Sequence, residues 1–278
     1  MVVHDISLTP SPKMQRAVGK LALRVASDGR YGARLADLRE QGSFRSIFPR
    51  PSGNSLDAVL LNTAGGVTGG DQFSIHADVE AGASLSLTTQ AAERIYAAIG
   101  EEAGLVRNRA TVAPEACLHW LPQETILFEG CNLDRRLDVD LAEGAGALIL
   151  EPLVFGRGAS GESIRNGALR DRVQITRVGS PIYLDGIQMS GDLTEQLDRS
   201  VIGGGARAMA SLIYVGTDAE ARLDPLRGLL PDTGGASMTR SDVLVMRLLA
   251  IDSYALRQTL LPILKLLTDD SIPKNWRL

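Results

Sequence analysis

Three segments in the middle of the chain repeat one another. They are ADVEAGASLSLTTQ (77–90), ATVAPEACLHWLPQ (110–123) and VDLAEGAGALILEP (139–152), and they align without a gap. In each, one strand ends at an acidic or glycine-containing turn, and a second strand begins with apolar residues at every other position. A strand-turn-strand unit cannot bury its apolar face alone, so repeated units stack on one another. The repeats therefore predict a mainly β fold of stacked, β-helix-like layers.

Equivalent positions of the three repeats carry similar side chains. The alignment groups Val79 with Val112 and Leu141, Ala83 with Ala116 and Ala145, and Leu87 with Trp120 and Ile149. Further strands are expected on both sides of the repeats, at 20–27, 56–62, 172–178, 181–189 and 241–250.

The helical portion is expected to be small. Helical patterns occupy 90–98, part of 192–201 before three glycines, and 253–267, where Pro262 predicts a kink or a break. No Ser/Gly-rich linker or charge block interrupts the chain, so residues 1–278 are expected to form one domain.

The net charge and the hydropathy of the chain limit the kinds of partner that it can be expected to bind. The chain has 29 basic and 33 acidic residues and a net charge of −4, which leaves no basic surplus to hold a nucleic acid. No segment approaches the roughly 18 apolar residues of a membrane helix, and the first residues lack the apolar core of a secretory signal. We therefore expect a cytoplasmic protein with neither nucleic acid nor membrane as partner.

Cys117 and Cys131 are expected to be ordinary reduced thiols.

The histidines argue against a tight metal site. His4, His76 and His119 are the only ones, and no two have helical or hairpin spacing. A permanent zinc or nickel site built from this chain alone is not expected, nor is a tightly bound cofactor.

The segment LLNTAGGVTGGDQF (60–73) concentrates four glycines, Gly65, Gly66, Gly69 and Gly70. Two of them have the spacing of a phosphate-binding loop, but Asp71 and Gln72 stand where such a loop needs a lysine and a hydroxyl. The dinucleotide-binding pattern fails too, because a strand rather than a helix follows. The glycines are expected to supply positive φ and close backbone approach.

Motifs of catalysis are missing from the sequence. There is no GxSxG, no HExxH and no cysteine with a family signature, and Ser160 in GRGASGE has no histidine nearby in sequence. The chain is not expected to be an enzyme. In the same stretch Arg157 is expected to pair with Glu162 or Glu151, and Gly161 to serve backbone geometry.

Five blocks, taken in order, resemble the urease accessory protein D family, also called protein H. They are NTAGGVTGGDQF, GASLSLTTQAAERIY, LHWLPQETILFEG, GRGASGE and PKNWRL, and the resemblance runs from about residue 18 to the end. The chain departs from the commonest pattern at Thr63 and Ala64, where many members have prolines, and at Gln72, where an arginine or a similar residue is frequent.

The resemblance implies a non-enzymatic role in urease maturation. Members of this family bind the urease apoprotein and recruit accessory protein F, which docks the GTPase G that carries nickel. The family fold is a β-rich, helix-like stack with a pair of helices at one end. The resemblance also implies an internal channel through which nickel passes toward urease.

A nickel conduit should hold the ion weakly at several points, because a tight histidine or cysteine site would trap it. Carboxylates and hydroxyls in the matched blocks are candidates for such transient contact, although each one could instead cap or solvate the fold. They are Asp71, Thr88, Thr89, Glu93, Glu124, Glu129, Glu151 and Glu162. The alternative function is a β-solenoid-like enzyme or binding module that uses the Gly65–Asp71 loop on a small molecule.

Overall fold

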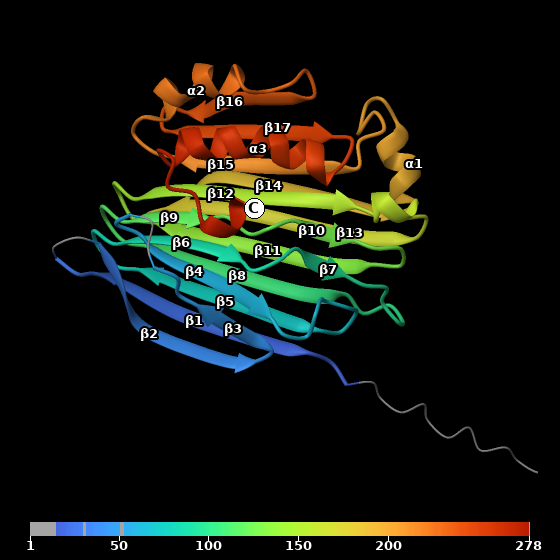
Figure 1. The fold of residues 1–278 in the computed structure, drawn as a ribbon, viewed down its shortest axis with the longest axis horizontal. Helices are drawn as coiled ribbons and strands as arrows, with labels where there is room; N and C mark the ends of the chain where they lie inside the picture. Colours follow the sequence, from blue (N-terminus) through green and yellow to red (C-terminus); the bar gives the residue numbers. More distant parts are fainter. Residues whose placement is uncertain (1–14, 30–31, 51–52, 278) are drawn as a thin grey trace, which may run out of the picture.

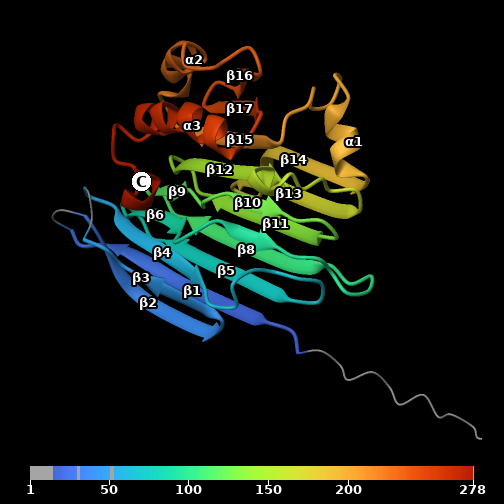
Figure 2. The same cartoon turned by 45° about the vertical axis from the view of Figure 1, so that its right-hand side comes forward.

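The computed structural model describes residues 15–29, 32–50 and 53–277, so His4 lies outside the described residues. Two β-sheets face each other in it (Figures 1 and 2). Sheet A has seven strands in the order β14 (Ser180–Gly191), β13 (Gly167–Arg177), β11 (Asn132–Leu141), β8 (Gly104–Val112), β5 (Gln72–Val79), β1 (Val18–Ser27) and β2 (Ala33–Gly42).

Sheet B has ten strands. Eight of them follow the order β16 (Gly234–Arg240), β17 (Val243–Ala250), β15 (Ala208–Val215), β12 (Gly146–Phe155), β9 (Cys117–Trp120), β6 (Ser84–Thr89), β4 (Leu56–Asn62) and β3 (Phe44–Ile47). The two short strands β7 (Glu93–Ile95) and β10 (Thr125–Leu127) continue the sheet beside the far half of β12.

The three sequence repeats form successive coils of this stack. Each coil sends its first strand (β5, β8 or β11) through sheet A and its second (β6, β9 or β12) through sheet B, and neighbouring coils pair in parallel. The residues grouped by the alignment are direct neighbours, since Val112 pairs with both Val79 and Leu141, and Trp120 pairs with both Leu87 and Ile149. The prediction of a stacked, mainly β fold is confirmed.

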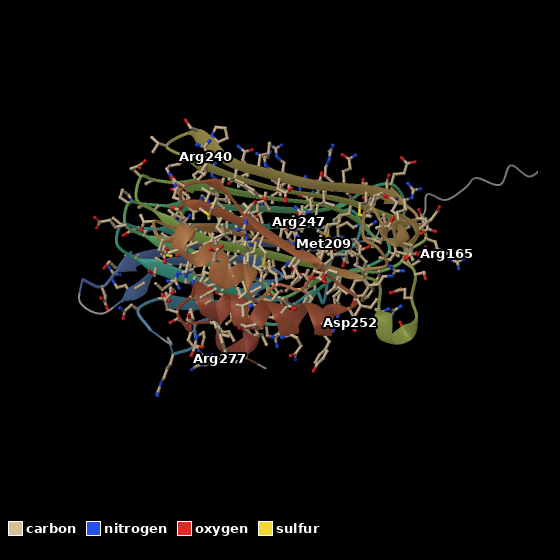
Figure 3. All side chains as sticks on the ribbon, turned by 90° about the horizontal axis from the view of Figure 1, so that it is seen from above. Arg165, Met209, Arg240, Arg247, Asp252 and Arg277 are labelled. Carbon is tan, nitrogen blue, oxygen red and sulfur yellow. The ribbon has the colours of Figure 1, made fainter. Side chains whose placement is uncertain are left out.

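Two apolar cores hold the layers together. The first lies between the sheets and takes the alternating inward residues of every coil, such as Leu85, Leu118 and Leu133. The second lies between sheet B and the helices α2 (Ala219–Arg227) and α3 (Ser253–Leu267), which lie on the side of the stack away from β14 in Figure 3. Because β12 is buried on both faces, its sequence is almost continuously apolar rather than alternating.

Most of the predicted elements are present. The expected strands correspond to β1, β4, β13, β14 and β17, and the expected helix at 253–267 is α3. That helix continues through Pro262 rather than ending there. The helix within 192–201 is the short α1 (Leu193–Asp198), whose N-cap Asp192 accepts a hydrogen bond from the backbone N–H of Glu195.

The predicted helix at 90–98 is wrong. The segment contains β7, and its backbone bonds go to other coils: Glu93 N–H donates to Glu124 O at 2.9 Å and Tyr96 N–H to Val67 O at 2.8 Å. Pairing with neighbouring coils satisfies the backbone and overrides the weak helical preference of the sequence. The sequence patterns did not predict the following elements: β2, β3, β10, β15, β16, α2 and the 3₁₀ turns at Gly158–Ser160 and Lys274–Trp276. None of the helices in the described ranges has the length and apolar character needed to cross a membrane.

Candidate functional site

A cavity of about 290 Å³ lies between the two sheets, at the end of the coils where β7 and the glycine loop meet. Its walls are mostly apolar, with Phe73, Leu87 and Trp120 among them. The polar residues that line it are Asn62, Thr89, Gln90, Glu93, Arg94, Asn108, Gln123, Thr125, Arg135 and Glu151. An apolar cavity with a few placed polar groups is typical of a functional site.

Glu93 is anchored to the glycine loop by Asn62. The amide nitrogen of Asn62 lies 3.2 Å from both carboxylate oxygens of Glu93 and 3.1 Å from the backbone oxygen of Gly66, and its amide oxygen accepts the N–H of Ala64 at 3.0 Å. Burial raises the pKa of Glu93 to about 7, although the hydrogen bond from Asn62 acts in the opposite direction. The side chain of Asn62 thus holds both the loop and a half-buried carboxyl.

The glycines let this loop pack against the 94–102 segment. A Cβ on Gly66 would lie 2.5 Å from the backbone oxygen of Arg94, and one on Gly69 would lie 2.4 Å from that of Glu102. Gly65 and Gly70 have φ of 81° and 83°, values that favour glycine. Asp71 closes the loop: its Oδ1 accepts the N–H of Ala17 at 2.8 Å and its Oδ2 that of Thr68 at 2.9 Å. Asp71 is not among the residues that line the cavity.

Inside the cavity, a buried ion cluster crosses from sheet A to sheet B. Arg135 of β11 donates to both carboxylate oxygens of its neighbour Asp171 on β13, at 2.9 and 2.6 Å. The guanidinium also lies 2.7 Å from Glu151 Oε2 on β12 and donates to Thr125 at 3.0 Å. Glu151 Oε1 accepts the indole N–H of Trp120 at 3.0 Å.

The charges of this cluster are coupled. Burial raises the pKa of Glu151 above its usual range, against the attraction of Arg135. Burial disfavours the guanidinium of Arg135, but Asp171 and Glu151 more than offset this, so the pKa of Arg135 lies above its usual value. The cluster has one arginine and two carboxylates, so it carries a net negative charge whenever Glu151 is ionised. Glu151 is the carboxylate of the two that lines the cavity.

The rim of the cavity is fastened by the segment at 274–276. Asn275 donates to Thr88 Oγ1 at 3.2 Å, and the indole N–H of the buried Trp276 donates to Leu121 O at 2.9 Å. Arg257 of α3 stacks on the Trp276 ring and donates to Gln123 at 2.8 Å. Thr88 and Glu124 therefore contact the side chains that hold the rim and not the cavity. The carboxylate of Glu124 lies 3.4 Å from Arg257.

Two other candidate carboxylates organise the turns near Arg157. The carboxylate of Glu162 accepts hydrogen bonds from both Nε and Nη2 of Arg157, each at 3.0 Å, so Arg157 pairs with Glu162 and not with Glu151. Glu129 Oε2 accepts the N–H of Arg165 at 2.6 Å. Gly161 adopts a φ of 68° in this turn. Of the eight candidate residues, the structure brings Thr89, Glu93 and Glu151 to the cavity wall.

Nitrogen and sulfur ligands do not converge anywhere in the described residues. No group of three or more His, Cys, Asp and Glu residues is arranged there to hold a metal ion. Cys117 and Cys131 are free thiols, and burial raises the pKa of each to about 11. Burial lowers the pKa of His119 to about 4, against the attraction of Asp269.

Sequence reasoning missed Asn62, Arg135 and Asp171. A signal for the last two was present, because both stand at positions where the alternation of their strand predicts an apolar inward residue. Arg135 falls between Leu133 and Leu137, and Asp171 occupies the same phase of β13. Opposite charges at inward positions of two strands indicate a buried ion pair. Nothing in the sequence placed Asn62 beside Glu93.

The arrangement offers oxygen atoms at separated points on the wall of a mostly apolar cavity. Carboxylate, amide and hydroxyl oxygens suit a hydrated divalent cation held weakly, whereas tight binding of zinc or nickel favours converging imidazole or thiolate groups.

Comparison with known proteins identifies the family. The family model described as UreD urease accessory protein matches residues 17–277. A Roseobacter denitrificans protein named urease accessory protein UreD is 49% identical over 264 residues, covering 95% of this chain and 96% of that protein. A Ruegeria pomeroyi protein of the same name is 52% identical over 242 residues, covering 87% and 94%. The chain belongs to the UreD urease accessory protein family.

Proposed function

We propose that this chain acts in urease maturation as a scaffold, and that the cavity between its sheets forms part of a path by which nickel reaches the urease active site. The observation that carries the proposal is a cavity lined by the buried carboxyl of Glu151, the half-buried carboxyl of Glu93 and the hydroxyl of Thr89. Family membership supports the maturation role.

In this proposal nickel is cargo and not a resident cofactor. Glu93 meets the ion at the glycine loop, and Glu151 meets it deeper, beside Trp120. Neither position has the imidazole or thiolate groups that would trap nickel, so contact is transient and the ion moves on. The other five candidates, Asp71, Thr88, Glu124, Glu129 and Glu162, hold the loops and the rim in place.

The partners in this proposal are the urease apoprotein and accessory proteins F and G. The chain binds the apoprotein and recruits F, which docks the GTPase G, and it acts in the cytoplasm without catalysing a reaction itself. The names of the relatives, which refer to urease, support this assignment.

The test is urease activity and nickel content in cells that carry the urease subunits and every other accessory gene. Activity should require this chain, and Glu93→Gln with Glu151→Gln should lower the nickel content of urease while co-purification with protein F is retained. Glu143→Gln on the exposed β11–β12 turn is the matched control. Full nickel loading without the chain would overturn the maturation role. Full loading with the double variant would overturn the path alone.

A further inference from the structure

The outer face of sheet A, on the side away from the helices, carries a row of arginines. Arg136 on β11 pairs in register with Arg107 on β8 and with Arg172 on β13. Their buried neighbours on each strand point into the core, so the three arginines share the outer face. Like charges directly opposite each other on neighbouring strands are destabilising, and the fold holds two such contacts in succession.

The row lines a hollow of about 660 Å³. Gly186 on β14 pairs with Arg172 and continues the row without a side chain, which leaves that end open. Arg170 joins the hollow from the next level of β13. Leu184, which is 61% exposed, adds an apolar edge.

The arginines are only partly neutralised within the chain. Arg107 pairs with Asp134 at 3.0 Å and Arg136 with Asp138 at 2.6 Å. Arg172 donates to the neutral Gln174 at 2.7 Å. The side chain of Arg170 makes no ion pair or hydrogen bond with any residue in the described ranges. Positive charge without an acidic partner therefore lies on β13, at Arg170 and Arg172, on a chain whose net charge is −4.

The neighbourhood favours a carboxylate-bearing protein segment over other anions. Three carboxylates also line the hollow, Asp134, Asp171 and Asp185, and they would repel a ligand that carries charge on every unit, such as a polyphosphate or a nucleic-acid backbone. No aromatic ring lines the hollow, so bases would find no stacking surface. Guanidinium groups bind carboxylates in paired hydrogen bonds, and Leu184 suits an apolar residue between acidic ones.

We propose that this hollow is a docking site for an acidic segment of a protein partner, bound across Arg136, Arg170 and Arg172. Helices α2 and α3 cover sheet B and leave this face of sheet A uncovered (Figure 2). Arg135 lines both the hollow and the cavity, but the outer arginines Arg136, Arg170 and Arg172 line only the hollow, and the proposal does not depend on the nickel path.

The test uses the full chain and a fluorescein-labelled peptide, EELEEL, with fluorescence anisotropy at low and high ionic strength. Wild-type protein should bind the peptide, more weakly at high ionic strength. Arg136→Ala with Arg172→Ala should weaken binding at least about tenfold, because paired guanidinium–carboxylate contacts are lost. Arg39→Ala with Arg199→Ala removes the same charge from exposed sites elsewhere and should have little effect.

Three results would overturn the proposal. One is no binding of the peptide by the wild-type protein. Another is equal weakening by the two double variants, which would mean that net charge alone matters. The last is tighter binding of tripolyphosphate or of duplex DNA than of the peptide. Thermal unfolding followed by circular dichroism verifies that each variant is folded.

Discussion

The amide nitrogen of Asn62 lies 3.2 Å from both carboxylate oxygens of Glu93, across 31 residues of sequence. The same nitrogen donates to the backbone of Gly66. Through Asn62, the glycine loop therefore supports a half-buried carboxyl at the cavity.

Removal of this support should destabilise the protein. Asn62→Ala leaves Glu93 without its side-chain donor, and an unsatisfied buried group costs about 1–3 kcal/mol. Urea denaturation of both proteins at neutral pH measures the loss. Asn54→Ala, on an exposed turn, should change the free energy of unfolding by less than about 0.5 kcal/mol. An equal effect of the two substitutions would contradict the role of Asn62.

Glu93 should make stability depend on pH. Its pKa in the folded protein is about 7, above the ordinary value of 4.5, so the folded state binds the proton more tightly than the unfolded state. The resulting stabilisation is complete below pH 4.5 and is lost as the pH rises through 7. The difference in free energy of unfolding between wild type and Glu93→Gln should fall across this window by up to about 1.4 kcal/mol per pH unit. Urea denaturation in metal-free buffer measures it, and a pH-independent difference would refute the assignment.

The buried pair of Arg135 with Asp171 should not tolerate neutralisation of Asp171. Asp171→Asn leaves the guanidinium of Arg135 short of one buried counter-charge, which should cost about 3–5 kcal/mol in free energy of unfolding. Asp37→Asn breaks a pair with Arg39 in which both side chains are about half exposed or more, and should cost less than about 1 kcal/mol. Guanidinium chloride is unsuitable because it screens charge, so urea midpoints provide the comparison. Similar midpoints for the two variants would argue against a tightly held cluster.

Substitution of Gly66 by any residue with a side chain should destabilise the protein. Gly66→Ala forces a Cβ to within 2.5 Å of the Arg94 backbone oxygen, and overpacking of this kind typically costs about 1–3 kcal/mol. Gly158→Ala is a matched control, since its added Cβ would meet nothing within 4 Å and its φ is not positive. Thermal unfolding of both variants decides the point, and a tolerated Gly66→Ala would show that the loop shifts freely.

Trp276 should stabilise the cavity rim. Its side chain is fully buried, and Trp276→Ala should cost about 3–5 kcal/mol. Trp276→Phe keeps most of the apolar contact but loses the hydrogen bond to Leu121, and should cost about 1 kcal/mol. Limited proteolysis of both variants, with cleavage mapped to 121–125, tests whether the rim loosens. Cleavage elsewhere would count against the fastening.

The coils could be predicted from the sequence because similar apolar side chains recur at equivalent positions of each repeat. Val79, Val112 and Leu141 occupy one level in three coils, and alternation alone reveals which face of each strand is buried. The segment at 90–98 was misjudged because its helical spacing is local, whereas the bonds that fix it come from Val67 and Glu124.

The cavity residues were found only in part for a related reason. Acidic residues in matched blocks pointed to Glu93 and Glu151, but the blocks do not reveal which carboxylates face inward. Glu162 and Asp71 also carry carboxylates and stand in equally distinctive motifs, yet both accept hydrogen bonds from backbone or arginine donors in turns. Side-chain direction depends on coil register, which the fold sets.

The fastening of the rim also has a consequence for biosynthesis. Asn275 and Thr88 are separated by 187 residues, and Asn275 follows every strand of both sheets in the chain. Coils can form one after another as the polypeptide leaves the ribosome, since domains assemble from the N-terminal side during synthesis. The rim can close only after residue 276 has left the ribosome. A nascent chain, or one truncated before residue 275, therefore has the cavity wall but lacks the contacts of Asn275 and Trp276 that close the rim. Release of residues 275 and 276 from the ribosome is thus the step that finishes the site.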